Sequence, residues 1–242
     1  MTLYEFFYIL GEPLLPVLPG KVRKNVAHIV RDFSHSVELL DVGGRKSPYT
    51  IGLKANVTVT DIPRETEVQH KLNLGFTEDI REHLQKKRSN VSRVIIDDMT
   101  QSQLPSESFD IIVAVEVIEH VPQDEAFVRE ICRILKPGGY AYLTTPNGDY
   151  IRNEPPNYNP DHIRHYKREQ LSDLLDKYFC SVNVTYGVRT GKYRANGLRS
   201  LNTRHPLRTL ESLGSNVINR LESKGVEQQS ERTAHLFAVA QK

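Results

Sequence analysis

The alternation of short aliphatic runs with stretches of helical periodicity constrains the fold of this chain more than any other feature. Seven runs of four to seven residues have the composition of strands, and several are aliphatic almost throughout, as in strands buried on both faces of a parallel sheet. The strands are expected at 37–42, 57–61, 94–97, 109–115, 140–145, 181–186 and 234–240, and helices at 21–33, 124–135 and 168–179. This order predicts a doubly wound α/β fold with a mostly parallel sheet.

Composition excludes several other classes of protein. The chain has 242 residues, 38% of them hydrophobic, which is enough for a buried core and rules out a wholly disordered chain. Its net charge of +2 is too small for a dedicated nucleic-acid binder. Its two cysteines, Cys132 and Cys180, stand in no metal-binding pattern and cannot form a disulfide framework. We therefore expect a cytoplasmic protein without structural zinc.

Acidic residues and glycines follow the predicted strands, where a doubly wound sheet binds its ligand. The first strand leads into Asp41, Gly43 and Gly44, and the glycines allow a tight turn with close backbone approach to a ligand. Asp61 ends the second strand, and its carboxylate could accept hydrogen bonds from both hydroxyls of a ribose. Further polar segments follow the third, fourth and fifth strands, at 97–99, 116–121 and 144–147.

Several short motifs occur in a fixed order along the chain. They are Leu-Pro at 104–105, Ser-Phe-Asp at 108–110, Glu-Val-Ile-Glu-His-Val at 116–121, Leu-Lys-Pro-Gly-Gly at 135–139 and Asp-His-Ile-Arg-His-Tyr at 161–166. This pattern resembles the class I S-adenosylmethionine-dependent methyltransferases, and within them the branch that methylates small molecules such as sugars and quinone precursors. The resemblance covers residues 35–186 and the last strand. It implies a Rossmann-like sheet of seven strands whose last strand is antiparallel.

The resemblance also implies a cofactor, S-adenosyl-L-methionine, with S-adenosyl-L-homocysteine as its product. It places the turn after the first strand beside the methionine part of the cofactor, the acid after the second strand on the ribose, and the following residue beside the adenine. The two residues after the third strand would contact the adenine, and the acid after the fourth would lie along the cofactor through its backbone. In that order the residues are Asp41, Gly43 and Gly44; Asp61 and Ile62; Asp98 and Met99; and Glu116.

One departure from the family pattern stands in the first turn. The family usually has glycine at three alternate positions after the acid, and here Arg45 and Ser47 replace the second and third of them. Either the backbone turn differs or the cofactor sits slightly further out.

Three histidines are candidates for the catalytic base. Transfer of a methyl group to an alcohol benefits from a general base, and histidine is suited to this near neutral pH. His120 follows the fourth strand, and His162 and His165 lie in the loop after the fifth. Each could instead be structural, orienting or capping its loop. The acids after the second and third strands could imitate a metal site, but cofactor binding explains their positions, so we expect no catalytic metal.

The chain divides into three predicted parts. Residues 1–34 would form an apolar arm and a helix, residues 35–186 and 233–242 the cofactor-binding core, and residues 187–232 a basic insertion or lid before the last strand. Between 177 and 210 there are seven basic residues and no acid. This stretch could be a solvated lid or an oligomer contact, a pocket for an anionic acceptor, or an RNA-binding surface, although stacking aromatics are few. The oligomeric state stays open.

The N-terminal arm, residues 3–18, is apolar but is interrupted by Gly11, Glu12 and the prolines at 13 and 16 and followed by Pro19, so it is not expected to span a membrane. Its basic residues follow the apolar part, the reverse of the order in a secretory signal. The arm could pack on the body of the protein, or touch a lipid surface or a lipid substrate from the periphery of a membrane.

The sequence thus predicts an S-adenosylmethionine-dependent methyltransferase that acts on a small molecule, with O-methylation of an anionic sugar or a lipid-linked metabolite as the first hypothesis. An RNA methyltransferase and a non-catalytic protein that binds the cofactor or a partner are the alternatives. A nicotinamide-dependent dehydrogenase would share the acid after the second strand, but residues 43–48 lack the Gly-x-Gly-x-x-Gly that it should show.

Overall fold

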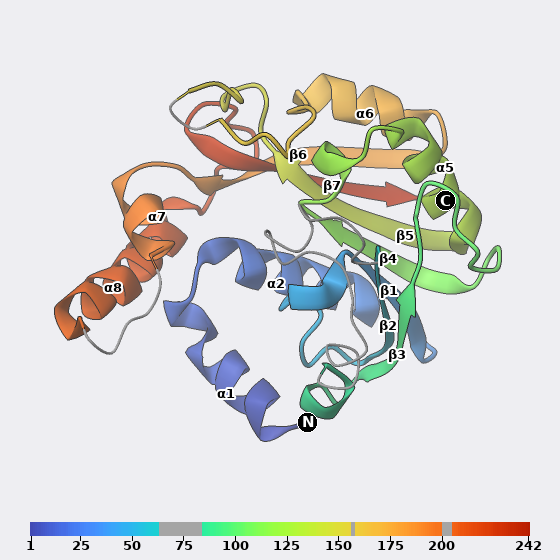
Figure 1. The fold of residues 1–242 in the computed structure, drawn as a ribbon, viewed down its shortest axis with the longest axis horizontal. Helices are drawn as coiled ribbons and strands as arrows, with labels where there is room; N and C mark the ends of the chain where they lie inside the picture. The colour runs from blue at the N-terminus through green and yellow to red at the C-terminus, as the bar shows by residue number, and fades with distance from the viewer. Residues whose placement is uncertain (63–83, 156–157, 200–204) are drawn as a thin grey trace.

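The computed structural model describes residues 1–62, 84–155, 158–199 and 205–242. At its centre is a seven-stranded sheet in the order β3-β2-β1-β4-β5-β7-β6 (Figure 1). The strands are β1 (Val37–Val42), β2 (Ala55–Asp61), β3 (Val91–Ile96), β4 (Phe109–Val115), β5 (Leu135–Pro146), β6 (Ser181–Arg189) and β7 (Thr233–Gln241). Neighbours from β3 to β5 are parallel, and β7 runs antiparallel to β5 and β6. The predicted Rossmann-like, doubly wound α/β fold with an antiparallel last strand is confirmed.

Each face of the sheet has its own hydrophobic core. Leu40 and Val42 of β1 pack with the apolar sides of α5 (Asp124–Ile134) and α6 (Arg168–Asp176). Val37 and Leu39 belong to the other core, together with α2 (Val17–Arg31). Successive residues of a strand point to opposite faces, so the nearly continuous aliphatic runs follow from helices covering both faces (Figure 1).

The segment 135–139 forms the start of β5. Helix α5 ends at Ile134, and the pairing of β5 with β4 shifts register between Phe109 and Ile111. Gly138 lies in this irregular stretch with a φ of +75°. Lys-Pro-Gly-Gly is typical of a helix stop followed by a turn. The helix does stop there, but the glycines lie inside the strand as an irregularity of its pairing.

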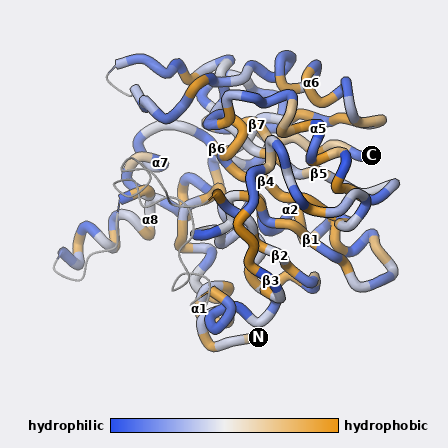
Figure 2. The backbone as a smooth tube through the Cα atoms, turned by 45° about the vertical axis from the view of Figure 1, so that its right-hand side comes forward, coloured by the Kyte–Doolittle hydropathy of each residue, from blue (hydrophilic) through white to orange (hydrophobic). Residues whose placement is uncertain are grey.

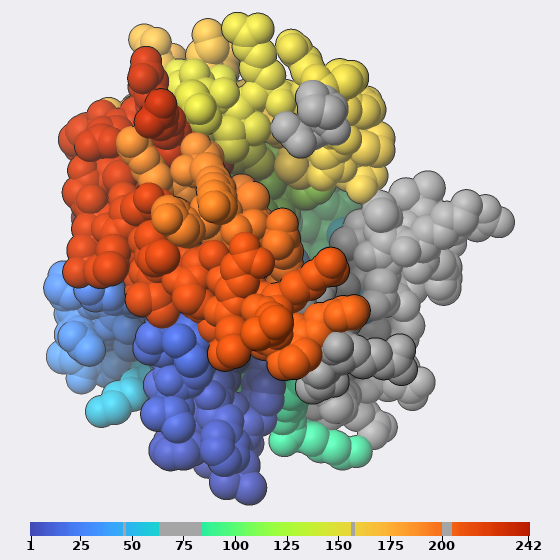
Figure 3. All heavy atoms as spheres, turned by 90° about the vertical axis from the view of Figure 1, so that its left-hand side faces the viewer, coloured from blue at the N-terminus to red at the C-terminus, as the bar shows by residue number. Residues whose placement is uncertain are grey.

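Two helices, α7 (Lys192–Gly197) and α8 (Pro206–Glu222), connect β6 to β7. Helix α8 turns its polar side inward, since Asn216 donates to the carbonyl of Leu14 (3.0 Å) and Asn219 to that of Arg189 (2.8 Å). Its leucines at 207, 210 and 221 are exposed. Figure 3 shows α8 lying across the N-terminal segment on one face of the molecule.

The N-terminal helix α1 (Leu3–Gly11) is held by polar contacts. The buried carboxylate of Glu5 accepts hydrogen bonds from the backbone N–H of Thr2 and from the N–H and hydroxyl of Ser89. The apolar side chains of Leu3, Phe6, Phe7 and Leu10 are exposed instead. Figure 2 shows both hydrophobic and hydrophilic stretches along α1. Among the described residues, no helix combines the length and the apolar character needed to cross a membrane. Contact of this arm with a lipid surface stays a prediction.

Candidate active site

The chain turns sharply after β1, at Gly43 and Gly44. Gly43 has a φ of +67°, in the left-handed region that favours glycine, and a Cβ there would lie 2.9 Å from Val117. A Cβ on Gly44 would lie 2.7 Å from Cγ1 of Val59 and 2.9 Å from Cγ of Asp41. The two glycines therefore allow the turn to run close against the ends of both β2 and β4.

Asp41 holds this turn in place through hydrogen bonds. Its buried carboxylate accepts hydrogen bonds from the hydroxyls of Ser47 and Thr50, both at 2.6 Å. The buried guanidinium of Arg88 donates to the same Thr50 hydroxyl (2.6 Å) and to the carbonyl of Ser47 (3.1 Å). Burial raises the pKa of Asp41, and the charge of Arg88 opposes that rise. Ser47, which stands where the family has glycine, is thus a bonded member of the turn.

Asp61 and Ile62 lie at the end of β2, where Asp61 is level with Ile96 of β3. The backbone N–H of Ile62 donates to Oδ1 of Asp61 (2.9 Å), and the Ile62 side chain is exposed. The carboxylate of Asp61 therefore lies at the carboxyl edge of the sheet, in the position predicted for a ribose ligand.

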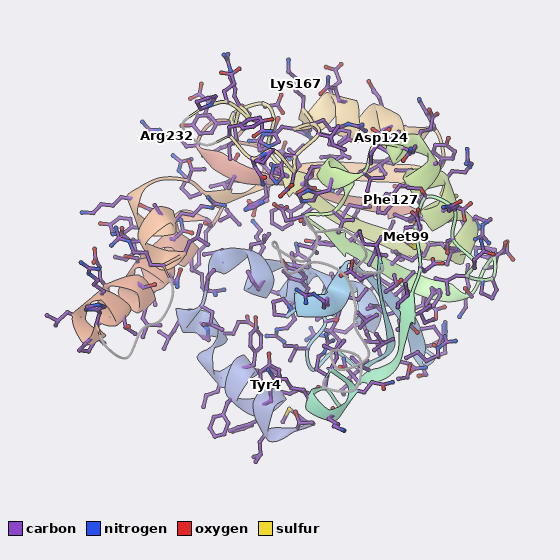
Figure 4. The ribbon with its side chains drawn as sticks, in the orientation of Figure 1. Tyr4, Met99, Asp124, Phe127, Lys167 and Arg232 are labelled. Carbon is purple, nitrogen blue, oxygen red and sulfur yellow. The ribbon has the colours of Figure 1, made fainter. Side chains whose placement is uncertain are left out.

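Asp98 and Met99 follow β3 and differ in what they can offer a ligand. Asp98 accepts hydrogen bonds from the N–H (2.9 Å) and hydroxyl (2.8 Å) of Thr100; burial raises the pKa of Asp98, but these bonds outweigh it and hold the pKa low. Met99 is buried in the core with Phe127, beneath α5 (Figure 4). Any contact between Met99 and an adenine would therefore come from its backbone.

Glu116 ends β4 in a conformation that is rare for a residue with a side chain. Its φ is +54°, a strain that persists only where the surroundings hold it. The hydroxyl of Thr144 donates to Oε1 of Glu116 (2.8 Å), and Nδ1 of His235 lies 3.0 Å from Oε2. Burial raises the pKa of Glu116, but the opposing effect of His235 is part of a larger downward shift, so the pKa lies below its ordinary value. With its side chain tied back, Glu116 presents its backbone at the edge of the sheet.

Arg194 of α7 extends this contact into the basic insertion. Its guanidinium donates to Nε2 of His235 (3.2 Å), and Nδ1 of the same ring donates to Glu116. From the sequence, Arg194 is one of the seven basic residues between 177 and 210 and, with Arg199, a candidate contact for an anionic acceptor, whereas His235 was not singled out. No local signal could have joined them, because the contact spans 41 positions.

The three predicted histidines lie in one cluster. The rings of His120 and His162 have centroids 4.8 Å apart, and Nδ1 of His162 lies 2.8 Å from Nε2 of His165. The loop that carries His162 and His165 is tied to the short helix η3 (Ile118–His120) by a hydrogen bond from the N–H of Ile163 to the carbonyl of Glu119 (2.9 Å).

Backbone carbonyls fix the tautomers of this cluster. Nδ1 of His120 lies 2.8 Å from the carbonyl oxygen of Asp161, and Nδ1 of His165 lies 2.9 Å from that of Ile151. Because a carbonyl only accepts, both Nδ1 atoms carry hydrogen, and Nε2 of His165 accepts from Nδ1 of His162. Burial lowers the pKa of His162, as do the other two histidines. In these tautomers the ring lone pairs of His120 and His162 lie on Nε2.

Glu119 lies against the histidines with a buried carboxyl group. It is 0% exposed, and neither carboxylate oxygen has a hydrogen-bond partner in the part of the chain that the structure describes. Its Oε1 lies 3.9 Å from Nε2 of His120. Burial, and then repulsion by Glu116, raise the pKa of Glu119 well above its ordinary value. Sequence reasoning missed this residue as a site residue, although an acid between Ile118 and His120 was a visible signal.

A cavity of about 280 Å³ opens next to His235. It is formed by the start of α2, by α7 and α8, and by Tyr49, and its walls are mostly apolar. Arg194 supplies positive charge to this lining, and Asn216 and Asn219 supply amides. Arg199 lies elsewhere, exposed and 3.6 Å from Glu211. A cavity of this size, with few polar groups, suits a small molecule.

A glycine turn after β1, an acid after β2 and a tied-back acid after β4 meet at the carboxyl edge of a doubly wound sheet. This arrangement defines a Rossmann-like protein with a site for a nucleoside-containing cofactor. Residues 40–143 match the family model described as a methyltransferase domain. This segment is therefore similar to the class I S-adenosylmethionine-dependent methyltransferases, whose cofactor is S-adenosylmethionine.

Curated relatives match a limited part of the chain. It is 35% identical over 111 residues to a probable S-adenosylmethionine-dependent methyltransferase of Mycolicibacterium smegmatis, covering 45% of this chain and 41% of that protein. It is 29% identical over 102 residues to a ubiquinone biosynthesis O-methyltransferase of Shewanella halifaxensis, covering 36% of this chain and 43% of that protein. The chain thus spans less than half of the length of these relatives.

Solved structures share the fold over nearly the whole chain. A SAM-dependent methyltransferase of Thermotoga maritima, a possible histamine N-methyltransferase, has a TM-score of 0.58 and 17% identity, over 99% of this chain and 94% of that one. Phosphoethanolamine N-methyltransferase 2 of Haemonchus contortus, in complex with S-adenosyl-L-methionine, has a TM-score of 0.59 and 17% identity, over 90% of this chain and 52% of that one.

Proposed function

We propose that this chain transfers the methyl group of S-adenosylmethionine to a hydroxyl oxygen of a small-molecule acceptor. The observation that carries the proposal is the junction of the cofactor edge with the histidine cluster. His120 follows Glu116 by four residues, in the helix that leaves β4, and the loop after β5 brings His162 and His165 to it. The O-methyltransferase among the relatives supports an oxygen acceptor.

In this reaction the acceptor oxygen attacks the methyl carbon, the carbon–sulfur bond breaks, and S-adenosylhomocysteine and one proton are released. The turn at Gly43 and Gly44 and the backbone of Glu116 position the cofactor, and Asp61 holds its ribose. Such positioning can lower a barrier by several kcal/mol, and by about 7–11 kcal/mol in ideal systems. Nε2 of His120 or of His162 receives this proton from the acceptor hydroxyl.

The acceptor in this proposal carries an anionic group that lies in the cavity beside His235. Arg194 is the basis for this part, because its guanidinium lines the cavity and is hydrogen-bonded there to the imidazole of His235. An anionic sugar fits this charge, and a lipid-linked metabolite fits the apolar walls, which α2, α7 and α8 form.

Replacing Arg194 with glutamine should raise the KM for an anionic acceptor by roughly 10- to 100-fold, because a hydrogen bond to a charged group contributes about 1.5–3 kcal/mol. KM would be measured with the best substrate from a panel of phosphorylated and carboxylated alcohols. Arg199→Gln is the matched control, since Arg199 is exposed and paired with Glu211. Equal KM values for both variants would contradict the anionic acceptor.

Binding of the cofactor is tested by thermal unfolding with S-adenosylhomocysteine, with NAD as the control ligand. At 100-fold excess over Kd the ligand adds about 2.7 kcal/mol to the free energy of unfolding, which for a chain of this size raises Tm by about 5–11 °C.

Asp61→Ala should weaken this binding by roughly 10- to 100-fold, through loss of charged hydrogen bonds to the ribose. Asp173→Ala, at an exposed position of α6, is the control. Absence of a shift in the unmodified chain would overturn the proposed function.

A further inference from the structure

We propose that Glu119, His120 and His162 form a binding site for one divalent first-row transition-metal cation, of the kind represented by Zn²⁺ and Mn²⁺. One ligand atom from each of these three residues can be chosen so that all of them lie within 4.8 Å of one another. Two imidazoles and one carboxylate are a donor set that such cations prefer. From the sequence we expected no catalytic metal, because cofactor binding explains the acids after β2 and β3.

The carboxylate of Glu119 is the first independent reason for this site. It is fully buried, and its two oxygens have no hydrogen-bond partner among the described residues. A buried carboxylate is normally paired, hydrogen-bonded or bound to a metal, because its desolvation is otherwise uncompensated. A cation between Glu119 and the two imidazoles would supply the missing partner.

The tautomers of the histidines are the second reason. The carbonyl of Asp161 holds the hydrogen of His120 on Nδ1. Two successive hydrogen bonds, from His165 to the carbonyl of Ile151 and from His162 to His165, hold the hydrogen of His162 on Nδ1 as well. Both Nε2 atoms therefore carry the lone pairs that metal binding requires. Ligating histidines commonly donate their other N–H to a carbonyl or another acceptor, which fixes the orientation of the ring. His165 is in this sense a positioning residue for His162.

The site would have three protein ligands and an open side. The His120 side chain is 40% exposed, so the cluster is reachable from solvent. Metal sites with three protein ligands and an open position are the catalytic kind, in which water or a substrate oxygen completes the coordination.

This step rests on the proposed function: the open position would take the acceptor hydroxyl, whose pKa the cation lowers. The hydroxyl proton then leaves to water, the oxygen attacks the methyl carbon, and the cation keeps its oxidation state. The imidazoles act as ligands in this state, and as proton acceptors only when the cation is absent.

The test is calorimetric titration of the full chain, freed of metal with a chelator and dialysed, with Zn²⁺ and with Mn²⁺. We expect one equivalent of cation to bind, and binding to be lost in Glu119→Gln and in His162→Ala. His165→Ala should weaken binding by about 10- to 100-fold, as is typical of residues that orient a ligand. His28→Ala, on the exposed side of α2, is the control and should bind like the unmodified chain. Circular dichroism establishes that each variant is folded.

Absence of binding, or equal binding by Glu119→Gln and the unmodified chain, would overturn the proposal. Binding of Mg²⁺ as tight as that of Zn²⁺ would contradict the imidazole ligands, because Mg²⁺ favours oxygen donors. These titrations contain no cofactor and no acceptor, so their failure leaves the thermal shift with S-adenosylhomocysteine unaffected. Conversely, metal binding without that shift would retain the site and reject the methyltransferase function.

Discussion

Alanine in place of His162 should lower kcat for methyl transfer by about 10²- to 10⁴-fold, the range expected when a positioned group that handles a proton is removed. His120→Ala should have a similar effect, because both residues carry a lone pair on Nε2 in the same cluster. The affinity for S-adenosylhomocysteine should change little, since the cofactor is assigned to the ends of β1, β2 and β4. Single-turnover rates, with the affinity from calorimetry, measure the two effects separately.

Two variants make this expectation specific. His165→Ala should lower kcat less than His162→Ala does, because His165 acts by orienting His162 through the 2.8 Å hydrogen bond. His28→Ala should leave kcat unchanged. The histidines could act as proton acceptors when no cation is bound, or as ligands of the cation. The loss of kcat in His162→Ala should therefore appear both in assays with a chelator and in assays with added Zn²⁺. Full turnover in both His120→Ala and His162→Ala would place the chemistry elsewhere in the molecule.

The strands that carry the site could be predicted because their composition depends on burial, which is visible locally. β1 and β4 have the predicted bounds, since they are central and covered on both faces. The predicted bounds of β2 and β3 differ from the observed ones by one to three residues. A bulge between Val57 and Thr58 shifts the pairing of these two strands. Where a strand ends depends on its neighbour, which the sequence of one strand does not contain.

Helix α8 shows where periodicity misleads. The spacing of its leucines predicts a helix, and the helix forms, but its buried residues are polar. Asn216 and Asn219 satisfy carbonyls of segments far away in the sequence, and these bonds decide which side faces inward. A hydrophobic pattern therefore gives the element but does not by itself give its orientation.

The candidate site was predictable as a set of residues but not as a set of contacts. Asp41 and the three histidines stand at recognisable positions after strands. The partners that define their chemistry come from distant segments: Arg88 supports the turn of Asp41, and Asp161 fixes the tautomer of His120. The role of Glu119 depended most on the structure, because a carboxylate without a hydrogen-bond donor can be recognised only when the positions of its neighbours are known.

Removing the Asp41 carboxylate, by Asp41→Ala, should lower the free energy of unfolding by about 3–5 kcal/mol, the range for breaking a buried charged network by deleting one partner. The hydroxyls of Ser47 and Thr50 would lose their acceptor, and the buried guanidinium of Arg88 would lose the nearby charge of Asp41. For a chain of this size the loss lowers Tm by about 6–20 °C. The turn that holds Gly43 would lose its support, so binding of S-adenosylhomocysteine should fall as well. Urea unfolding followed by circular dichroism measures the stability.

The matched control for this loss is Glu38→Ala, three residues earlier on β1. The Glu38 carboxylate is half-buried and accepts hydrogen bonds from the side-chain amide of Asn56 (2.9 Å), so its removal should lower stability by only about 1 kcal/mol. A double variant, Asp41→Leu with Arg88→Met, removes both charges and should recover part of the stability lost in Asp41→Ala, because no unpaired guanidinium remains buried. If Asp41→Ala lost no more stability than Glu38→Ala, Asp41 would not be the residue that holds the cofactor turn in place.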